Sequence, residues 1–311
     1  MRTSCCLSNS TIKGLVVIVL GLAPHLVVAR QPLQQYHRSL ERRANSGNAA
    51  AQLELALAYR SGSVNGKRDY DKAFQLLSKS ADQNYVPAEF WLGNAYEHGL
   101  GHPIDYVSAI RWFRKAADAG YALAEASLGD IYSDGTAAAR DEQLAMSWYR
   151  KAADHGDPRS MSILGVAYYK GLPFPKDFQN AAMWFRHSCD KGAPEGCYYI
   201  ARMYQDGVGV PKDERNAFAY FNRAADKYYT EAFYEVGMCY ENGSGVARDE
   251  VSALAWFQLS AELFDKRGER MAATVASYLS HDQVERARKK LQTLKEHLSH
   301  SGDVNGVIRK K

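Results

Sequence analysis

The sequence is poor in the residues and patterns that mark several large classes of protein. No strong excess of charge is present, because its 311 residues hold 39 Lys and Arg against 35 Asp and Glu. Proteins that bind nucleic acids usually carry a clear basic excess. Its five cysteines have no zinc-ligand spacing, and its nine histidines form no H-E-x-x-H pattern. We therefore expect no nucleic-acid partner, no metal and no other cofactor.

Long apolar runs are also scarce. With 46% hydrophobic and 24% charged residues, the chain is too polar for a polytopic membrane protein and too apolar for wholesale disorder. One apolar run, residues 15–22, follows Arg2 and Lys13 and precedes a few small residues, which is the order of a secretory signal peptide. We expect residues 1–29 to be that signal, the mature chain to begin near Arg30, and the protein to be periplasmic or secreted.

An uncleaved membrane anchor is the alternative for this segment. Residues 14–29 are fewer than the roughly 20 that a membrane-spanning helix needs, which favours the signal peptide. The membrane is expected as a partner only if the segment stays attached.

The rest of the sequence is dominated by a repeat. The segment that starts at Ala88 returns thirty-six residues later at Ala124, and the offset continues along the chain. Six copies occupy residues 51–264, and a period of this length predicts a solenoid. An aliphatic residue, a tyrosine and a glycine recur in copies two to six: Leu92, Leu128, Leu164, Ile200 and Val236; Tyr96, Tyr132, Tyr168, Tyr204 and Tyr240; Gly99, Gly135, Gly171, Gly207 and Gly243.

Each copy divides into two helices. In the first, Ala88, Leu92, Ala95 and Tyr96 follow the spacing of one buried helical stripe. The recurrent glycine closes this helix, because a residue without a Cβ readily takes the left-handed conformation. The following loop ends in an aspartate that can cap the second helix, and these aspartates are Asp69, Asp105, Asp141, Asp177, Asp213 and Asp249.

The second helix carries recurrent alanines and an aromatic pair, Trp112 and Phe113 in copy two. We interpret these aromatics as core and not as a ligand box, because one helical hairpin cannot bury its apolar face without its neighbours. The flanking residues 30–50 and 265–298 are expected to be helical caps. Residues 299–311 are expected to form a flexible basic tail.

The skeleton A-x-x-x-L-G-x-x-Y-x-x-G, followed by D, A-x-x-W-[YF] and K-A-A-x-x-G, resembles the Sel1-like repeat family, a relative of the tetratricopeptide repeat. The resemblance covers about two-thirds of the chain and implies an all-α fold, a right-handed superhelix of six αα-hairpins with helical caps. Copies five and six depart from it, because Tyr228 and Phe264 replace the final glycine.

The resemblance also implies a disulfide. Cys189 and Cys197 have the C-x7-C spacing of cysteine-rich Sel1-like proteins, across the same turn between two copies. An exported chain permits such a bond, and two buried free thiols are the alternative. Cys239 stands alone and is expected to be a small core residue.

A catalytic function is considered because some cysteine-rich members of the family are linked to β-lactam binding or hydrolysis. Ser188 and Lys191 match the S-x-x-K pattern, but no K-T-G or S-D-N accompanies them. A four-residue pattern of this kind arises by chance in a chain of this size. We expect that the protein is not an enzyme.

The expected binding surface is the side of the first helices opposite their buried stripe. Positions three, seven and ten of these helices point there, because each residue advances the helix by 100°, and in this class of superhelix they line the concave face. Exposed aromatics flanked by charges suit a groove for a protein or peptide. The alternative is that Phe90, Tyr198 and Tyr234 pack between neighbouring copies. The predicted groove residues are Phe90, Asn94, Asp130, Val166, Tyr169, Tyr198, Arg202, Tyr234 and Met238.

The sequence thus favours a monomeric, exported, non-catalytic scaffold or adaptor that binds a protein or peptide, with a role in the cell envelope. An enzyme that acts on β-lactams or cell-wall fragments is the alternative. A third hypothesis is a lumenal adaptor, because Asn242-Gly243-Ser244 is a glycosylation sequon, although it falls on a repeat turn.

Overall fold

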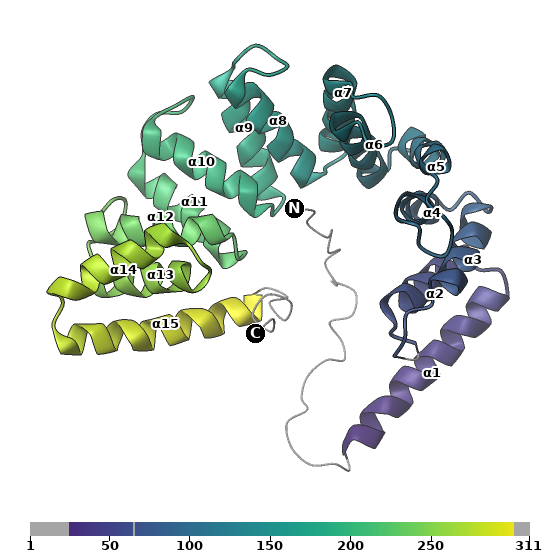
Figure 1. The fold of residues 1–311 in the computed structure, drawn as a ribbon, viewed down its shortest axis with the longest axis horizontal. Coiled ribbons are helices and arrows are strands. Elements are labelled where there is room, and N and C mark those ends of the chain that lie inside the picture. The colour runs from purple at the N-terminus through teal and green to yellow at the C-terminus, as the bar shows by residue number, and fades with distance from the viewer. Residues whose placement is uncertain (1–24, 65, 302–311) are drawn as a thin grey trace. The chain divides into compact units, whose positions relative to one another are not determined.

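The computed structural model describes residues 25–64 and 66–301. All regular structure in these ranges is helical (Figure 1). One compact unit ends at Asp105 and a second begins at Tyr106. Most of the predicted signal peptide and most of the predicted tail lie outside the described ranges. Among the described helices, none combines the length and the apolar character needed to cross a membrane.

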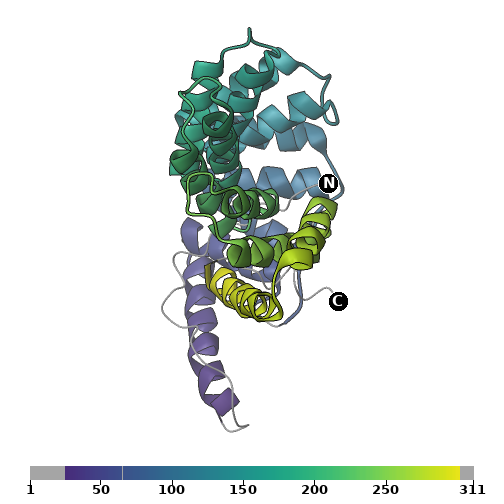
Figure 2. The ribbon, with the colours of Figure 1, turned by 90° about the vertical axis from the view of Figure 1, so that its left-hand side faces the viewer.

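The first unit holds four described helices and the second holds eleven, which pack mainly against their neighbours in the chain (Figures 1 and 2). The first unit contains α1 (His25–Asn45), α2 (Ala49–Ser61), α3 (Tyr70–Ala81) and α4 (Val86–His98). The second contains α5 (Tyr106–Asp118), α6 (Ala122–Asp134), α7 (Glu142–Asp154), α8 (Pro158–Lys170), α9 (Phe178–Asp190), α10 (Pro194–Asp206), α11 (Glu214–Asp226), α12 (Thr230–Asn242), α13 (Glu250–Glu262), α14 (Lys266–Tyr278) and α15 (His281–Ser301). Helices α2 to α13 are the first and second helices of the six copies, as predicted.

The recurrent glycines end the first helices as predicted. Each lies directly after its helix in the left-handed region, with φ between 66° and 81°, and donates its backbone N–H to a carbonyl of the last turn. They are Gly62, Gly99, Gly135, Gly171, Gly207 and Gly243. Tyr228 and Phe264, which replace the glycine after the second helix, adopt positive φ as well, 61° and 67°. The departure in sequence therefore changes the side chain and keeps the turn.

Five of the six predicted aspartate caps are confirmed by hydrogen bonds to the start of their helix. The carboxylate of Asp177 accepts hydrogen bonds from the backbone N–H groups of Gln179 and Asn180, at 3.0 and 2.9 Å. Four equivalent aspartates accept one from the residue three positions later, at 2.9 to 3.1 Å: Asp69, Asp141, Asp213 and Asp249. These bonds satisfy backbone donors that have no partner within the helix.

The core is built from the second aromatic residue of each pair and from small residues opposite it. Phe113, Phe185, Phe221 and Phe257 are fully buried. A Cβ placed on Gly237 of α12 would lie 2.7 Å from the Phe257 ring, so the glycine of the L-G motif makes room for that ring. Close-packed interiors leave no space for an added methyl group at such a contact.

In copies two, three and five the first aromatic of the pair lies nearer the surface, under a basic side chain of the same helix. In copy four Trp184 is buried, and the cation over its ring is Arg150 of α7. The Lys151 ammonium is 4.1 Å from the centre of the Trp148 ring, and Lys115 is 5.0 Å from Trp112. Copy six differs, because Leu259 takes the place of the lysine. Trp256 and Leu259 lie instead in a cluster with Leu291, Leu294 and Leu298 of α15.

The ends of the array are capped by helices. Leu40 and Ala44 of α1 pack against Ala51 and Leu55 of α2. Helix α14 packs on α13 as the first helix of a seventh copy would: a Cβ on Gly268 would clash with Ser260, as one on Gly196 would clash with Ser188. Helix α15 then runs beside α13 (Figures 1 and 2). The last complete copy is therefore covered on its outer side by the chain's own helix.

Candidate partner-binding surface

The predicted groove residues fall in both units. Phe90 and Asn94 lie on α4 in the first unit, and the other seven lie on α6, α8, α10 and α12 in the second. Phe90 is only 8% exposed, which corrects the expectation of an exposed ring there. Its side chain belongs to the interior of the first unit, whereas Asn94 is half-buried.

The seven residues of the second unit keep part of their surface in solvent. Tyr169 is 40% exposed, and the other six, Asp130, Val166, Tyr198, Arg202, Tyr234 and Met238, are half-buried. Val166 and Met238 also pack against buried clusters. Aromatic and arginine side chains with partial exposure are the residues that most often dominate binding at protein interfaces.

Asp130 belongs to a tight local network. Its carboxylate receives two parallel hydrogen bonds from the Arg159 guanidinium, at 2.8 and 2.9 Å, and one from the Tyr149 hydroxyl at 2.6 Å. Burial, followed by the Asp130 charge, raises the pKa of Tyr149 well above its usual value. This network joins α6, α7 and α8, so Asp130 is held by its own chain.

A second cluster consists of Tyr198, Arg202, Tyr234, Glu235 and Arg267. We call it the tyrosine-arginine cluster. The Tyr198 ring lies 5.2 Å from the Tyr229 ring and 5.8 Å from that of Phe221. The inner side of the Tyr234 ring packs against Phe257. The Arg267 guanidinium lies 4.5 Å from the centre of the Tyr234 ring. Both tyrosines therefore have one side in the core, in accord with the alternative of packing between copies.

Glu235 connects the two arginines of this cluster. Its Oε1 lies 3.4 Å from Nη1 of Arg202 on α10 and 3.8 Å from Nη1 of Arg267 on α14. Only 8% of the Glu235 side chain is exposed, against 43% for Arg202 and 44% for Arg267. The carboxylate thus lies beneath two guanidinium groups that remain open to solvent.

The pKa shifts in this cluster follow the burial of each group. Burial raises the pKa of Glu235 although Arg202 and Arg267 oppose the shift. Burial alone would lower the pKa of Arg202, but Glu235, Tyr198 and Asp206 together outweigh it and the pKa is raised. Burial therefore dominates at the carboxylate, which has lost nearly all of its water, and the neighbouring groups dominate at the half-exposed guanidinium.

Three residues of this surface had no separate signal in the sequence. Glu235 and Tyr199 occupy position four of their helices, and Tyr199 is 37% exposed while its ring stacks on Phe185 at 4.9 Å. Arg267 lies on the cap helix, outside the six copies. Counting α14 as the first helix of a seventh copy would have placed Arg267 just before position one.

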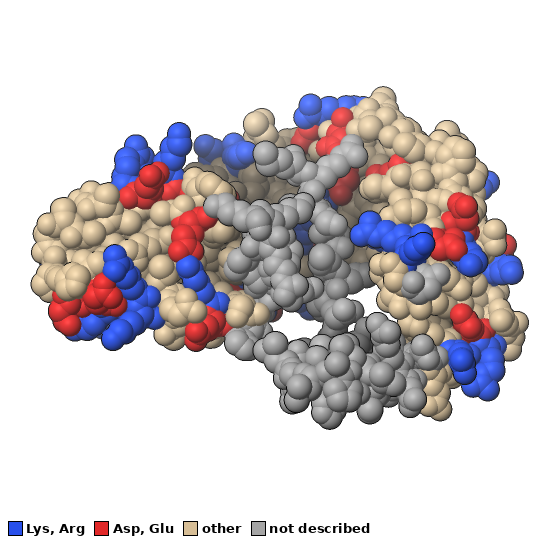
Figure 3. Space-filling model, turned by 60° about the horizontal axis from the view of Figure 1, so that its bottom comes forward, with Lys and Arg blue, Asp and Glu red and all other residues tan. Residues whose placement is uncertain are grey.

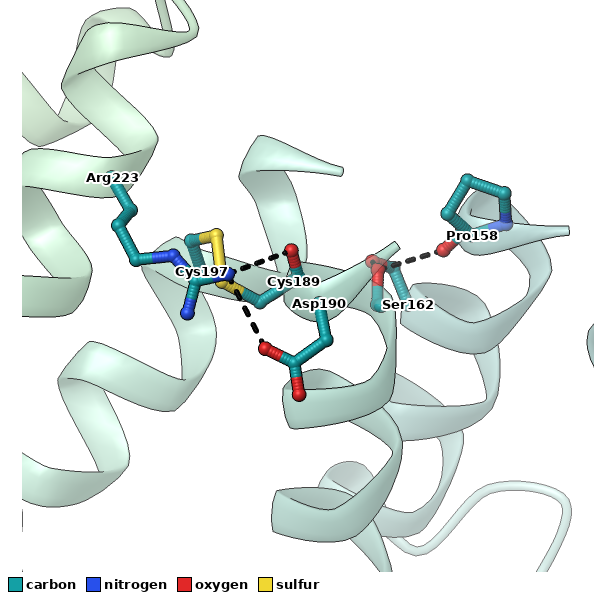
Figure 4. The surroundings of a disulfide bond; sticks show 7 residues. Pro158, Ser162, Cys189, Asp190, Cys197 and Arg223 are labelled. Atoms are coloured by element: carbon teal, nitrogen blue, oxygen red, sulfur yellow. Dashed lines mark hydrogen bonds and ion pairs between the residues drawn. A yellow bond between two sulfur atoms is a disulfide. The ribbon is translucent and has the colours of Figure 1, made fainter. Parts of the chain in front are cut away.

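Cys189 and Cys197 form a disulfide that joins the end of α9 to the start of α10, with the two Cα atoms 4.6 Å apart (Figure 4). The bond implied by the family resemblance is present. Arg223 of α11 donates hydrogen bonds to the Cys189 carbonyl oxygen and to Asp190, at 3.2 and 3.3 Å (Figure 4). Closing a loop of this size contributes about 2–3 kcal/mol in the chain-entropy model. Cys239 is free and buried, and burial raises the pKa of its thiol to about 12.

Ser188 of the S-x-x-K pattern is fully buried. Its hydroxyl lies 2.7 Å from both the Pro158 carbonyl oxygen and the Ser162 hydroxyl, and Figure 4 shows Pro158 and Ser162 on the helix that packs against the one carrying Cys189. Lys191 is exposed in the turn that follows α9. The hydroxyl is therefore engaged in holding α8 and α9 together.

Charge on the protein surface is mixed. On the face in Figure 3, basic and acidic side chains lie side by side and form no large field of one sign. Many belong to local ion pairs, such as Arg248 with Glu250 and Lys290 with Asp249. Exposed pairs of this kind contribute little to stability, but they leave the surface close to neutral.

Stacked two-helix repeats of this kind define an α-solenoid repeat protein. The Sel1 repeat model matches six consecutive segments, residues 49–85, 86–121, 122–157, 158–192, 194–229 and 230–263. The chain therefore belongs to the Sel1 repeat family.

Solved structures of Sel1 proteins resemble this fold. One is c5321, a protective antigen of uropathogenic Escherichia coli strains with an SLR fold: 30% identity, TM-score 0.73, 84% of this chain covered. This chain spans 56% of that one. Another is a Sel1 repeat protein of Oxalobacter formigenes, with 30% identity, TM-score 0.69 and coverage of 77% of this chain and 98% of that one. A comparison with curated proteins finds no match.

Proposed function

We propose that the protein is an exported, non-catalytic scaffold that binds a protein or peptide partner on the first helices of its second unit. The tyrosine-arginine cluster carries this proposal. It places two half-buried tyrosines and two half-exposed arginines on three consecutive first helices, α10, α12 and α14. Tyr and Arg supply a large contact area and several hydrogen-bond donors, and for this reason they are enriched at binding hot spots.

The outer surface of the second helices is a poorer candidate. Lys115 and Lys151 lie over the tryptophans of their own helices, and α15 covers the corresponding part of copy six. The first helices keep Tyr169 and Tyr199 exposed in copies four and five. This difference favours the first helices as the binding side.

The surroundings of Ser188, the serine that a β-lactam-hydrolysing enzyme would use, support a non-catalytic role. The Ser188 hydroxyl is buried and hydrogen-bonded to the backbone of α8. An acylated serine needs an accessible oxygen next to a base. We therefore propose a binding function over hydrolysis of β-lactams or cell-wall fragments.

Export to the periplasm or the cell exterior is supported by three observations. The disulfide suits an oxidising compartment. The sequence before residue 30 has the order of a signal peptide. The E. coli relative is a protective antigen, and an exported location gives an antigen access to the immune system.

Crosslinking in the cell envelope, followed by purification of the protein, tests the binding function. The test variant is Arg202→Gln, and the matched control is Arg215→Gln, an exposed arginine on the second helix α11. We expect Arg202→Gln to reduce the yield of the crosslinked partner at least five-fold and Arg215→Gln to leave it unchanged, with equal melting temperatures. Equal yields for the two variants would contradict the assigned surface, and nitrocefin hydrolysis by the purified protein would favour the enzyme.

A further inference from the structure

The tyrosine-arginine cluster contains more hydrogen-bonding capacity than its own residues use. Arg202 and Arg267 both direct Nη1 at the same oxygen, Oε1 of Glu235, at 3.4 and 3.8 Å. Charge-assisted N–H···O bonds in proteins are usually about 2.7–2.9 Å long. Neither arginine therefore makes a close bond to the buried carboxylate.

The other acidic partners are distributed unequally. Arg267 is anchored by Asp265, with Nη2–Oδ2 at 3.0 Å and Nε–Oδ1 at 3.2 Å. Arg202 has Asp206 as its second ion-pair partner, at 3.9 Å. Arg202 thus has no ion pair shorter than 3.4 Å among those described, and a guanidinium group has five N–H donors.

The surroundings favour a planar ligand group at this position. The Arg267 guanidinium lies over the Tyr234 ring, 4.5 Å from its centre, and Tyr198 is a hydrogen-bond partner of Arg202 and lies near the Glu235 charge. Two guanidinium groups held next to aromatic rings suit a carboxylate, which can accept parallel hydrogen bonds. Glu235 already places one carboxylate below them, at a distance that leaves the solvent side open.

We propose that Arg202 and Arg267 form a subsite for the side-chain carboxylate of an aspartate or glutamate in an acidic segment of the bound polypeptide. This inference rests on the proposed function and names the chemistry of its partner. Three carboxylates already surround the two arginines, so the ligand replaces the two longest contacts, that of Arg202 with Asp206 and that of Arg267 with Glu235. Glu235 then competes with the ligand for the same donors.

A side-chain carboxylate is chosen over a chain end because of the position of the subsite. Tyr198 and Tyr199 lie next to it on α10, and Tyr169 is exposed on the preceding first helix. On the other side, the exposed Tyr278 of α14 donates a hydrogen bond to Glu241 at 2.7 Å. Side chains that can contact a ligand thus lie on both sides of the subsite. A peptide segment with residues before and after its bound carboxylate needs such a surface.

The test uses the full mature chain and labelled heptapeptide pools with random flanks, acetylated and amidated at their ends. One pool has Glu at its centre and a second has Gln. A third has Gln at the centre and a free C-terminal carboxylate. Fluorescence anisotropy measures the affinity of each pool. We expect the Glu pool to bind at least ten-fold more tightly than either Gln pool.

Three variants assign the effect to these residues. Arg202→Gln and Arg267→Gln should each weaken binding of the Glu pool at least five-fold, and Arg215→Gln should not. Glu235→Gln removes the competing carboxylate and should strengthen binding about three- to ten-fold, which a purely structural role of Glu235 would not do. Circular dichroism checks that each variant is folded.

Several outcomes would overturn the proposal. These are equal binding of the Glu and Gln pools, preference for the free chain end, absence of binding by every pool, or weaker binding after Glu235→Gln in a folded variant. The crosslinking experiment separates this failure from failure of the proposed function. If Arg202→Gln still loses the crosslinked partner while the pools do not differ, the surface binds a partner of other chemistry.

Discussion

At the scale of single residues, one buried polar position is paired differently in two of the copies. Glu125 is almost completely buried, and its Oε2 lies 2.8 Å from Nδ1 of the half-exposed His155. In copy one the corresponding pair is Gln52 and Gln83, joined by a 2.7 Å hydrogen bond. One structural position is thus filled by an acid with a histidine or by two amides.

This correspondence predicts the effect of removing the histidine. His155→Ala leaves a buried carboxylate without this partner, which should lower the free energy of unfolding by about 1–3 kcal/mol. The double variant Glu125→Gln with His155→Gln copies the pair of copy one and should recover most of that loss. Urea unfolding at pH 7 measures both. If the double variant is as unstable as the single one, the pair is not equivalent to that of copy one.

At the scale of helices, the aspartate caps make the starts of several second helices sensitive to acid. A backbone hydrogen bond from the third helical residue is the main cause that lowers the pKa of Asp69, Asp177 and Asp213 below the usual value. In the unfolded chain each pKa returns to about 3.9. Their contribution to stability is therefore complete above about pH 4 and is lost as the pH falls through the folded-state pKa.

We predict that the melting temperature falls as the pH is lowered from about 5 to 2, and that Asp177→Asn combined with Asp213→Asn reduces this fall. Asparagine caps a helix about as well as aspartate, but it does not titrate. The variant should therefore match the unmodified protein at pH 7 and exceed it in acid. A scanning calorimetry series over pH tests this, and parallel curves would show that the caps do not cause the acid sensitivity.

Helices and turns could be predicted well from the sequence, because each depends on residues that recur at fixed spacing. The aliphatic stripe, the closing glycine and the capping aspartate act within one helix or one loop, and the observed helices follow them. The burial of Phe90 was not predictable in this way. Position three is buried in copies one to four and half-buried in copies five and six, so its exposure depends on side chains far away in the sequence.

A single departure from the repeat can indicate a contact with another helix, but only when the copies are compared. In copies two, three and five, Lys115, Lys151 and Arg223 lie over the preceding aromatic ring. Copy six has Leu259 at this position, which is buried together with Leu298 of α15. A leucine where four other copies have a lysine or an arginine marks the place where another helix packs.

At the scale of the whole molecule, stability should vary along the array. Each copy contacts mainly its neighbours, so a local defect in a solenoid affects nearby copies first. Helix α15 packs on α13 through its leucines and adds an ion pair from Lys290 to Asp249 and a contact of His297 Nε2 with the carboxylate of Asp226 on α11, at 3.5 Å. It therefore supports the last two copies.

Leu298→Asp should separate α15 from these copies, because Leu298 is 1% exposed and an aspartate there would bury a charge in an apolar cluster. We expect amide hydrogen exchange to become at least ten-fold faster in α15, α13 and α11 while α6 and α7 keep their protection. Leu172→Asp is the matched control, because Leu172 is 71% exposed in the turn after α8 and its replacement should change no helix. Coupling between neighbouring copies predicts a gradient of exchange rates that begins at α15 and ends before copy three. Faster exchange spread evenly over all copies would show instead that the second unit unfolds as one cooperative body.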